Sequence, residues 1–166
     1  MIALHEFNHL SHEKALALIH PCVALPGWAD ALALGRPYAN RDELFSTAKA
    51  LTHAWDDAAL AQALSAHPRI GEKPAGSQAE AALSRQEQGA VNEGDADLAQ
   101  ALREGNARYE ARFGRVFLIR AKGRSGEDIL QALRARLENS DAQEVRAALE
   151  QLREITLLRL EGVISE

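Results

Sequence analysis

The chain has 166 residues, with 19 Lys and Arg against 24 Asp and Glu, so its formal net charge is -5. A chain of this length can bury one hydrophobic core but is short for two, and we expect a single domain over residues 1–166. The acidic balance offers no polybasic stripe to neutralise a phosphate backbone, so we expect no nucleic-acid partner.

The sequence carries no pattern that would direct it out of the cytoplasm. Its N-terminus lacks the basic start and continuous apolar run of a signal peptide, and no apolar stretch approaches the ~20 residues of a membrane span. Cys22 is the only cysteine, which suits a reducing compartment. We therefore expect a cytoplasmic protein with no membrane partner.

Apolar residues recur at helical spacing through most of the chain, and strand patterns are almost absent. Ser11 is placed to cap a first helix, which Pro21 then stops because proline lacks the N–H that the next turn needs. Residues 25–38 contain two prolines and two glycines. We expect this stretch to be irregular, with at most one short turn of helix.

Two further helices are predicted before the middle of the chain. Asn40 followed three residues later by Glu43 is a capping-box pattern, which predicts a helix over residues 41–54. Asp56 can cap the next helix, which should end just before Pro68.

Glycine and proline dominate residues 69–76, which we expect to form a loop. Ser77 is a good cap for a helix that runs through Glu87. A long helix should begin near Asp95 and end where Gly114 adopts the left-handed cap conformation.

The last third begins with the apolar run 116–119, which is either a buried extended segment or a very short helix. Residues 123–126 form a turn, and helices are predicted over residues 127–137 and 141–160, the latter with a broad apolar face. The fold class that follows is all-α.

The pattern His5-Glu6-Phe7-Asn8-His9 has the histidine spacing of zinc proteases. Such a site needs a third ligand and a scaffold in front of the helix, whereas this helix would lie at the N-terminus, where chains commonly fray. We interpret the spacing as accidental and expect no metal.

Two other features have plain structural interpretations. Cys22 has no cationic neighbour in sequence to lower its pKa, so packing in the core is favoured over a role as nucleophile. A local basic cluster could bind an anionic small molecule or simply be solvated surface. It comprises Arg108, Arg112, Arg115, Arg120, Lys122 and Arg124.

His67 is followed by Pro68, which disfavours helical backbone at the histidine. Its imidazole therefore lies at a stiffened helix end, which suits a positioned acid or base with a pKa near neutrality. The alternative is a histidine that complements the negative end of the helix dipole. From spacing alone the alternative is favoured.

A second polar group occurs at residues 84–88. On a helix, Ser84 and Glu87 share a face and Gln88 lies one turn beyond Ser84, so they either point into one pocket or form an exposed polar face. Arg159 stands alone among leucines near the end of the last helix, where a guanidinium either reaches water or binds a buried anion.

Together these segments resemble the family of decarboxylases that convert 2-oxo-4-hydroxy-4-carboxy-5-ureidoimidazoline (OHCU) to (S)-allantoin in urate breakdown. The resemblance covers nearly the whole chain. It rests on the order and spacing of Phe7-Asn8, Arg36-Pro37-Tyr38, Ala66-His67-Pro68-Arg69-Ile70-Gly71, Ser84-Arg85-Gln86-Glu87-Gln88, Asn106-Ala107-Arg108-Tyr109-Glu110-Ala111-Arg112-Phe113-Gly114 and Glu154-Ile155-Thr156-Leu157-Leu158-Arg159-Leu160.

The resemblance implies an all-α, single-domain helical bundle particular to this family, a homodimer, and a small-molecule substrate handled without a cofactor. It also implies that His67 and Glu87 are catalytic. The substrate-binding residues that it implies are Pro68, Ser84, Arg85, Gln86, Gln88, Phe117, Leu118, Ile119, Arg120, Ala121 and Arg159, with residues 117–121 contributing backbone groups.

The chemistry of OHCU explains why such residues would suffice. Its carboxylate lies next to a ring C=N bond that accepts the electron pair when carbon dioxide leaves. The protein then has to hold the substrate, stabilise developing charge and deliver a proton. His67 could take a proton from the adjacent hydroxyl or give one back, and Glu87 would hold N–H donors. Tight binding of the departing carboxylate by Arg159 would stabilise the ground state and slow the reaction.

The alternative function is a non-catalytic helical module that binds a purine-derived small molecule.

Overall fold

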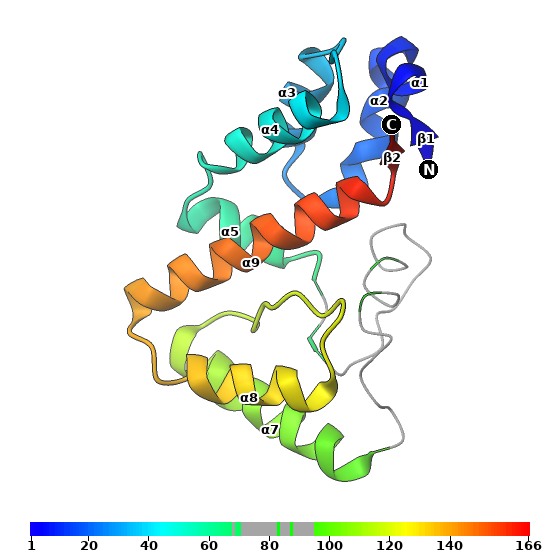
Figure 1. The fold of residues 1–166 in the computed structure, drawn as a ribbon. Coiled ribbons are helices and arrows are strands. Elements are labelled where there is room, and N and C mark those ends of the chain that lie inside the picture. Colours follow the sequence, from blue (N-terminus) through cyan, green and yellow to red (C-terminus); the bar gives the residue numbers. More distant parts are fainter. Residues whose placement is uncertain (68, 71–82, 84–86, 88–94) are drawn as a thin grey trace. The chain divides into compact units, whose positions relative to one another are not determined.

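The computed structural model describes residues 1–67, 69–70, 83, 87 and 95–166, and within them helices are the dominant secondary structure, with two very short strands (Figure 1). The all-α prediction is therefore confirmed. The α-helices are α1 (Leu4–His9), α2 (His12–Ile19), α3 (Pro26–Leu34), α4 (Arg41–Thr52), α5 (Asp57–Leu64), α7 (Ala96–Phe113), α8 (Gly126–Arg136) and α9 (Asp141–Glu161), and a 3-10 turn covers His20–Cys22. No helix in the described ranges is both long and apolar enough to cross a membrane.

The chain divides into two compact units, which we describe separately. Unit 1 comprises Met1–Ala63 with Arg153–Glu166, and unit 2 comprises Leu64–Leu152. Helix α9 thus contributes its first half to unit 2 and its second half to unit 1. The single domain expected from the length of the chain stays a prediction.

The two ends of the chain meet in unit 1, as Figure 1 shows. Strand β1 (Ile2–Ala3) pairs in parallel with β2 (Ile164–Ser165), and the Ile2 N–H donates to the Val163 carbonyl oxygen at 3.0 Å. Strands of two residues are too short to show an alternating pattern, which is why the sequence did not predict them.

Helices α2 and α4 in unit 1 begin with the side-chain caps that the sequence predicts. Ser11 Oγ accepts from the Lys14 N–H at 3.2 Å, and Asn40 Oδ1 accepts from the Glu43 N–H at 2.8 Å. The Glu43 carboxylate accepts in return from the Ala39 N–H, one residue before the cap. The predicted starts of α2 and α4 are therefore confirmed, and α4 ends two residues earlier than expected.

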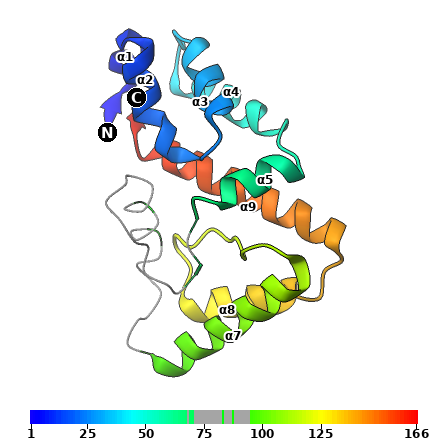
Figure 2. The same cartoon turned by 180° about the vertical axis from the view of Figure 1, so that it is seen from behind.

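The expectation that residues 25–38 are irregular was wrong, because helix α3 occupies nine of them. Pro26 lies in the first turn, where its missing N–H costs no hydrogen bond, and Gly35 is the C-cap. Helix α3 lies beside α4 in both views (Figures 1 and 2), and the Trp28 indole N–H donates to the Ala48 carbonyl oxygen at 3.1 Å. Burial of one face of α3 against α4 stabilises a helix that the local sequence does not predict.

In unit 2 the predicted start of α7 at Asp95 and its end at Gly114 are confirmed, and α8 begins and ends one residue earlier than predicted. The predicted cap Ser77 lies outside the described residues. Asp95 and Ser125 accept hydrogen bonds from the first turns of α7 and α8. Gly114 ends α7 with a φ of 73°, the left-handed conformation that glycine adopts without strain. Gly123 has a φ of 81° in the predicted turn.

Helices α7 and α8 pack closely against each other (Figure 2). A Cβ atom at Gly105 would come within 2.5 Å of Leu133 Cδ2, so a larger residue at this position would force the Leu133 side chain to move. The buried core between and beside these helices also receives residues from two loops. It consists of Ile70, Leu98, Leu102, Tyr109, Phe117, Ile119, Ala121, Ile129 and Leu133.

Candidate functional site

His67 lies just beyond the end of helix α5 in unit 2, on backbone that is not helical. Asp56 Oδ1 accepts from the Ala59 N–H at 3.0 Å, so Asp56 caps α5 as predicted. The His67 N–H donates to the Leu64 carbonyl oxygen at 3.1 Å, and the histidine is half-buried. The predicted position of His67 at a helix end is confirmed.

The loop after His67 is held to helix α7 at two points. The buried Asn106 donates through Nδ2 to the Ile70 carbonyl oxygen at 2.9 Å, and Ile70 lies in the core of unit 2. Arg69 forms a two-pronged ion pair with Glu110, with Nε–Oε2 at 3.0 Å and Nη2–Oε1 at 2.9 Å. Asn106 and Glu110 are one helical turn apart, so a single face of α7 holds this loop.

Asn106 and Glu110 are residues of the site that sequence reasoning missed. They lie in a segment that carries the family resemblance, but the resemblance implies no role for them. Their spacing of four residues on a long helix was the available signal, because side chains so spaced can contact the same neighbour. The neighbour itself could not be identified without the fold.

Residues 116–121 form the second segment of interest in unit 2, and they contain no helix or strand. Phe117, Leu118, Ile119 and Ala121 are nonetheless buried. Of the two predicted alternatives, the very short helix is therefore wrong and the buried segment is confirmed. Arg120 is half-buried, unlike its neighbours.

Hydrogen bonds hold this segment on both sides of Ile119. Arg136 donates through Nη1 to the Leu118 carbonyl oxygen, the Arg120 N–H donates to Gln151 Oε1 at 2.9 Å, and the Ala121 carbonyl oxygen accepts from a following N–H. Within the part of the chain that the structure describes, neither the N–H nor the carbonyl oxygen of Ile119 has a hydrogen-bond partner. Buried backbone groups are rarely left in that state, so Ile119 is the candidate for contact with a ligand.

A buried polar network lies under the same segment. Glu144 is 0% exposed and accepts from the Tyr109 hydroxyl at 2.6 Å, from Arg136 Nε at 2.8 Å and from Asn139 Nδ2 at 3.0 Å. Burial, reinforced by the hydrogen bond and charge of Glu144, raises the pKa of Tyr109 well above its usual value. Tyr109 therefore remains a neutral donor to Glu144 at ordinary pH.

Sequence reasoning also missed Arg136, Glu144 and Gln151. One signal could have found Glu144: it lies four residues before Ala148 and eight before Leu152, which places a carboxylate on the apolar stripe of α9. A charge in that position needs a buried partner. The identity of the partner, Arg136 on α8, depends on the tertiary structure.

Only part of the predicted polar group at residues 84–88 can be placed. Glu87 and its neighbour one turn earlier, Leu83, are both helical and half-buried, which confirms the predicted helix at these two positions. Pro68, Ser84, Arg85, Gln86 and Gln88 lie outside the described residues.

Arg159 belongs to unit 1, where it is 3% exposed. Its Nη1 donates to the carbonyl oxygen of Cys22 at 3.4 Å, a long hydrogen bond. Of the two sequence alternatives, the side chain that reaches water is wrong, because the guanidinium is buried. Cys22 is buried as well, which confirms its packing in the core.

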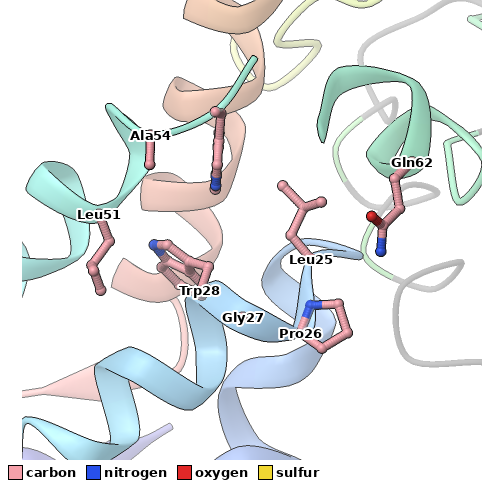
Figure 3. Close-up of a pocket in the computed structure, with 8 residues that line it drawn as sticks. Leu25, Pro26, Gly27, Trp28, Leu51, Ala54 and Gln62 are labelled. Carbon is pink, nitrogen blue, oxygen red and sulfur yellow. The ribbon is translucent and has the colours of Figure 1, made fainter. Parts of the chain in front are cut away.

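Figure 3 shows residues that line a cavity in unit 1. The volume of this cavity is about 320 Å³. Its walls are mostly apolar and include none of the predicted site residues; they are formed by Leu25, Pro26, Gly27, Trp28, Leu51, Ala54, Trp55 and Gln62. A second, more polar cavity of about 560 Å³ includes His5 and Asn8. Its lining also contains none of the predicted site residues.

The two histidines of the zinc-protease pattern, His5 and His9, contact each other. His9 Nδ1 lies 2.8 Å from the His5 carbonyl oxygen, and the two rings are 4.5 Å apart between centroids. Among the described residues, no three His, Cys, Asp or Glu side chains are placed to share a metal ion.

The chain matches the model of the OHCU decarboxylase family over residues 8–161. It is 32% identical over 164 residues to the 2-oxo-4-hydroxy-4-carboxy-5-ureidoimidazoline decarboxylase of Amia calva, covering 97% of this chain and 94% of that protein. It is 30% identical over 161 residues to the protein of the same name from Haloferax volcanii, covering 96% and 94%.

A solved structure of OHCU decarboxylase in the presence of (S)-allantoin is similar to this fold, with a TM-score of 0.72 and 27% sequence identity. The similarity covers 92% of this chain and 97% of that one. Helical content, the order of the motifs and the match over almost the full length lead to the same conclusion: the chain belongs to the OHCU decarboxylase family.

Proposed function

We propose that this chain decarboxylates OHCU to (S)-allantoin in urate degradation. Membership of the family supports the reaction. The geometric observation that carries the proposal lies in unit 2, where helix α7 holds both the loop of His67 and, through Tyr109 and its contacts, the segment of Phe117. Two segments about 50 residues apart in sequence are thus fixed to one rigid element, as positioned chemistry requires.

The reaction breaks the bond between the carboxylate carbon and its ring carbon. Carbon dioxide leaves as its electron pair forms a double bond to the neighbouring ring carbon and displaces the C=N electrons onto the ring nitrogen, which takes up a proton. The hydroxyl then gives up its proton as its carbon becomes a carbonyl, and the neighbouring ring carbon takes up a proton. We assign the proton transfer to His67, because its half-buried imidazole lies on backbone fixed by α7. Glu87 accepts hydrogen bonds from N–H groups of the substrate in this proposal.

Residues 117–121 provide the substrate-binding backbone in the same proposal. The ring and the ureido arm of OHCU both carry N–H donors and carbonyl acceptors. Ile119 has one donor and one acceptor that the described protein does not use, so its backbone can form an amide-like pair with such a substrate. Pro68, residues 84–88 and Arg159 complete the proposed binding set, following the family resemblance.

We further propose that the protein is a cytoplasmic, single-domain homodimer that needs no cofactor. The family resemblance supports these points, and the chemistry supports the last of them because the substrate accepts its own electron pair. Light scattering would test the dimer. Activity that survives chelation and dialysis would support the cofactor-free reaction, and activity restored only by added metal would overturn it.

The direct test generates OHCU from urate with the two upstream activities and follows the circular dichroism of allantoin. The wild-type chain should accelerate the appearance of one enantiomer. His67→Ala should lower turnover by at least ~100-fold while the fold is retained, since positioned acid–base groups contribute on that order. His53→Ala, an exposed histidine in unit 1, is the matched control and should retain full activity.

Each outcome decides a different point. A wild-type chain that does not accelerate allantoin formation overturns the proposed reaction, and binding of a purine-derived ligand without turnover would then favour the non-catalytic module. Full activity of His67→Ala in an active background would leave the reaction standing and overturn the role of the histidine.

A further inference from the structure

The Arg136 side chain contacts the proposed substrate-binding backbone at two adjacent residues. Its Nη1 donates to the Leu118 carbonyl oxygen, and its guanidinium carbon lies 4.5 Å from the centroid of the Phe117 ring. The side chain is only 12% exposed. A planar, five-donor guanidinium can form such a hydrogen bond and a face-on ring contact at the same time.

Arg136 is itself fixed from the other side. Both Nε and Nη2 donate to Oε1 of the buried Glu144, which also accepts from the Tyr109 hydroxyl. Tyr109 in turn packs edge-on against the Phe117 ring, with 5.2 Å between centroids. Phe117 is thus held between Tyr109 and Arg136. The hydrogen bonds that join Arg136, Glu144 and the Tyr109 hydroxyl favour a single conformation of the Phe117 segment.

We propose that Arg136 is a positioning residue of the substrate site: it fixes the backbone of residues 117–119 so that Ile119 presents its N–H and carbonyl oxygen to the substrate. This inference rests on the proposed function. The contact of Arg136 uses the carbonyl oxygen of Leu118, and Gln151 uses the N–H of Arg120. The protein therefore occupies the backbone groups on either side of Ile119 and leaves those of Ile119 to the ligand.

The test compares Arg136→Lys with Arg134→Lys. Lysine at position 136 keeps the charge next to Glu144, but an ammonium is a point donor that cannot also reach Leu118 and lie flat on Phe117. Arg134 lies on the same helix and is exposed, so its substitution controls for a change of residue type in α8. Arg136→Met removes the charge and serves as a more severe second variant.

For Arg136→Lys we expect KM to rise about tenfold with kcat within about threefold of wild type, because the backbone contacts bind substrate and transition state alike. Amide hydrogen exchange should accelerate at residues 118–121 while the amides of α7 and α8 stay protected. Arg134→Lys should match the wild type in both measurements.

Three outcomes would overturn the inference. Arg136→Lys could retain the KM of Arg134→Lys, or its exchange could accelerate throughout α7 and α8, which would make Arg136 merely structural. The third is wild-type protein without turnover, which removes the proposed function and this inference with it. Exchange data from the same samples distinguish these cases, because local acceleration at residues 118–121 reports on the segment whether or not the enzyme turns over.

Discussion

Two arginine–carboxylate pairs hold two segments of the proposed site in unit 2, and they do so in different surroundings. Arg69 and Glu110 hold the loop after His67, and their side chains are 47% and 26% exposed. Arg136 and Glu144 hold the segment of Phe117, with side chains 12% and 0% exposed. In both pairs two guanidinium nitrogens donate to one carboxylate, once near water and once inside the core.

The difference determines what each pair contributes. Near the surface, water and salt screen the attraction and compete for both groups, so the loop of His67 also relies on the buried hydrogen bond from Asn106. In the core, a charge that loses its partner cannot turn to water. The segment of Phe117 is therefore held by a network that must remain complete, whereas the loop of His67 can lose its ion pair and keep its position.

Removal of the buried carboxylate should have the largest effect. Glu144→Ala leaves Arg136, the Tyr109 hydroxyl and Asn139 without their common acceptor, and we expect a loss of about 3–5 kcal/mol in the free energy of unfolding. Urea denaturation measures this free energy of unfolding. Glu150→Ala, an exposed glutamate on the same helix, should change stability by less than about 0.5 kcal/mol. Equal losses in the two variants would contradict the comparison.

Loss of one donor to the same carboxylate should have an intermediate effect. Tyr109→Phe deletes the hydroxyl that donates to Glu144 and should cost about 1–2 kcal/mol at neutral pH. The pH dependence of stability gives a sharper test. Because burial raises the pKa of folded Tyr109, the unfolded chain loses its phenolic proton first, and folded protein is destabilised as the pH rises above about 10.

Tyr109→Phe should therefore lose stability less steeply than wild type above pH 10. Tyr38, the other tyrosine, also has a pKa raised by burial, but it is present in both proteins and its contribution cancels. Unfolding curves collected between pH 8 and pH 11 would compare the two slopes, with the pH range set by the ordinary tyrosine pKa of about 10. Parallel slopes would show that Tyr109 is not the buried phenol that the structure describes.

The exposed pair should show the smallest effect. A double-mutant cycle with Arg69→Ala and Glu110→Ala isolates their mutual interaction from the other contacts of either residue. We expect a coupling free energy below about 1 kcal/mol that shrinks further in 1 M salt. A coupling free energy of several kcal/mol would contradict the comparison, because it would mean that water does not screen the Arg69–Glu110 pair.

Much of the fold could be predicted from local sequence, for identifiable reasons. Asn40, Asp95 and Gly114 specify helix ends through contacts within a few residues, so their effect does not depend on the rest of the chain. Helix α3 shows the limit of such reasoning. The two prolines and two glycines of residues 25–38 predicted an irregular segment, and packing of Trp28 against α4 explains why much of it is helical.

For the site, local sequence predicted His67 at a helix end, Glu87 on a helix and an apolar run around Phe117. Residue types and short-range spacing are enough for these local features, whereas the resemblance to the OHCU decarboxylase family made them candidates for catalysis and substrate binding. The contacts that fix these segments depend on the packing of the whole unit. Asn106 to Ile70 and Arg136 to Leu118 join parts of the chain whose separation in sequence carries no periodic signal. A buried charge in an amphipathic pattern indicates that a partner exists, but the partner is chosen by how the helices pack.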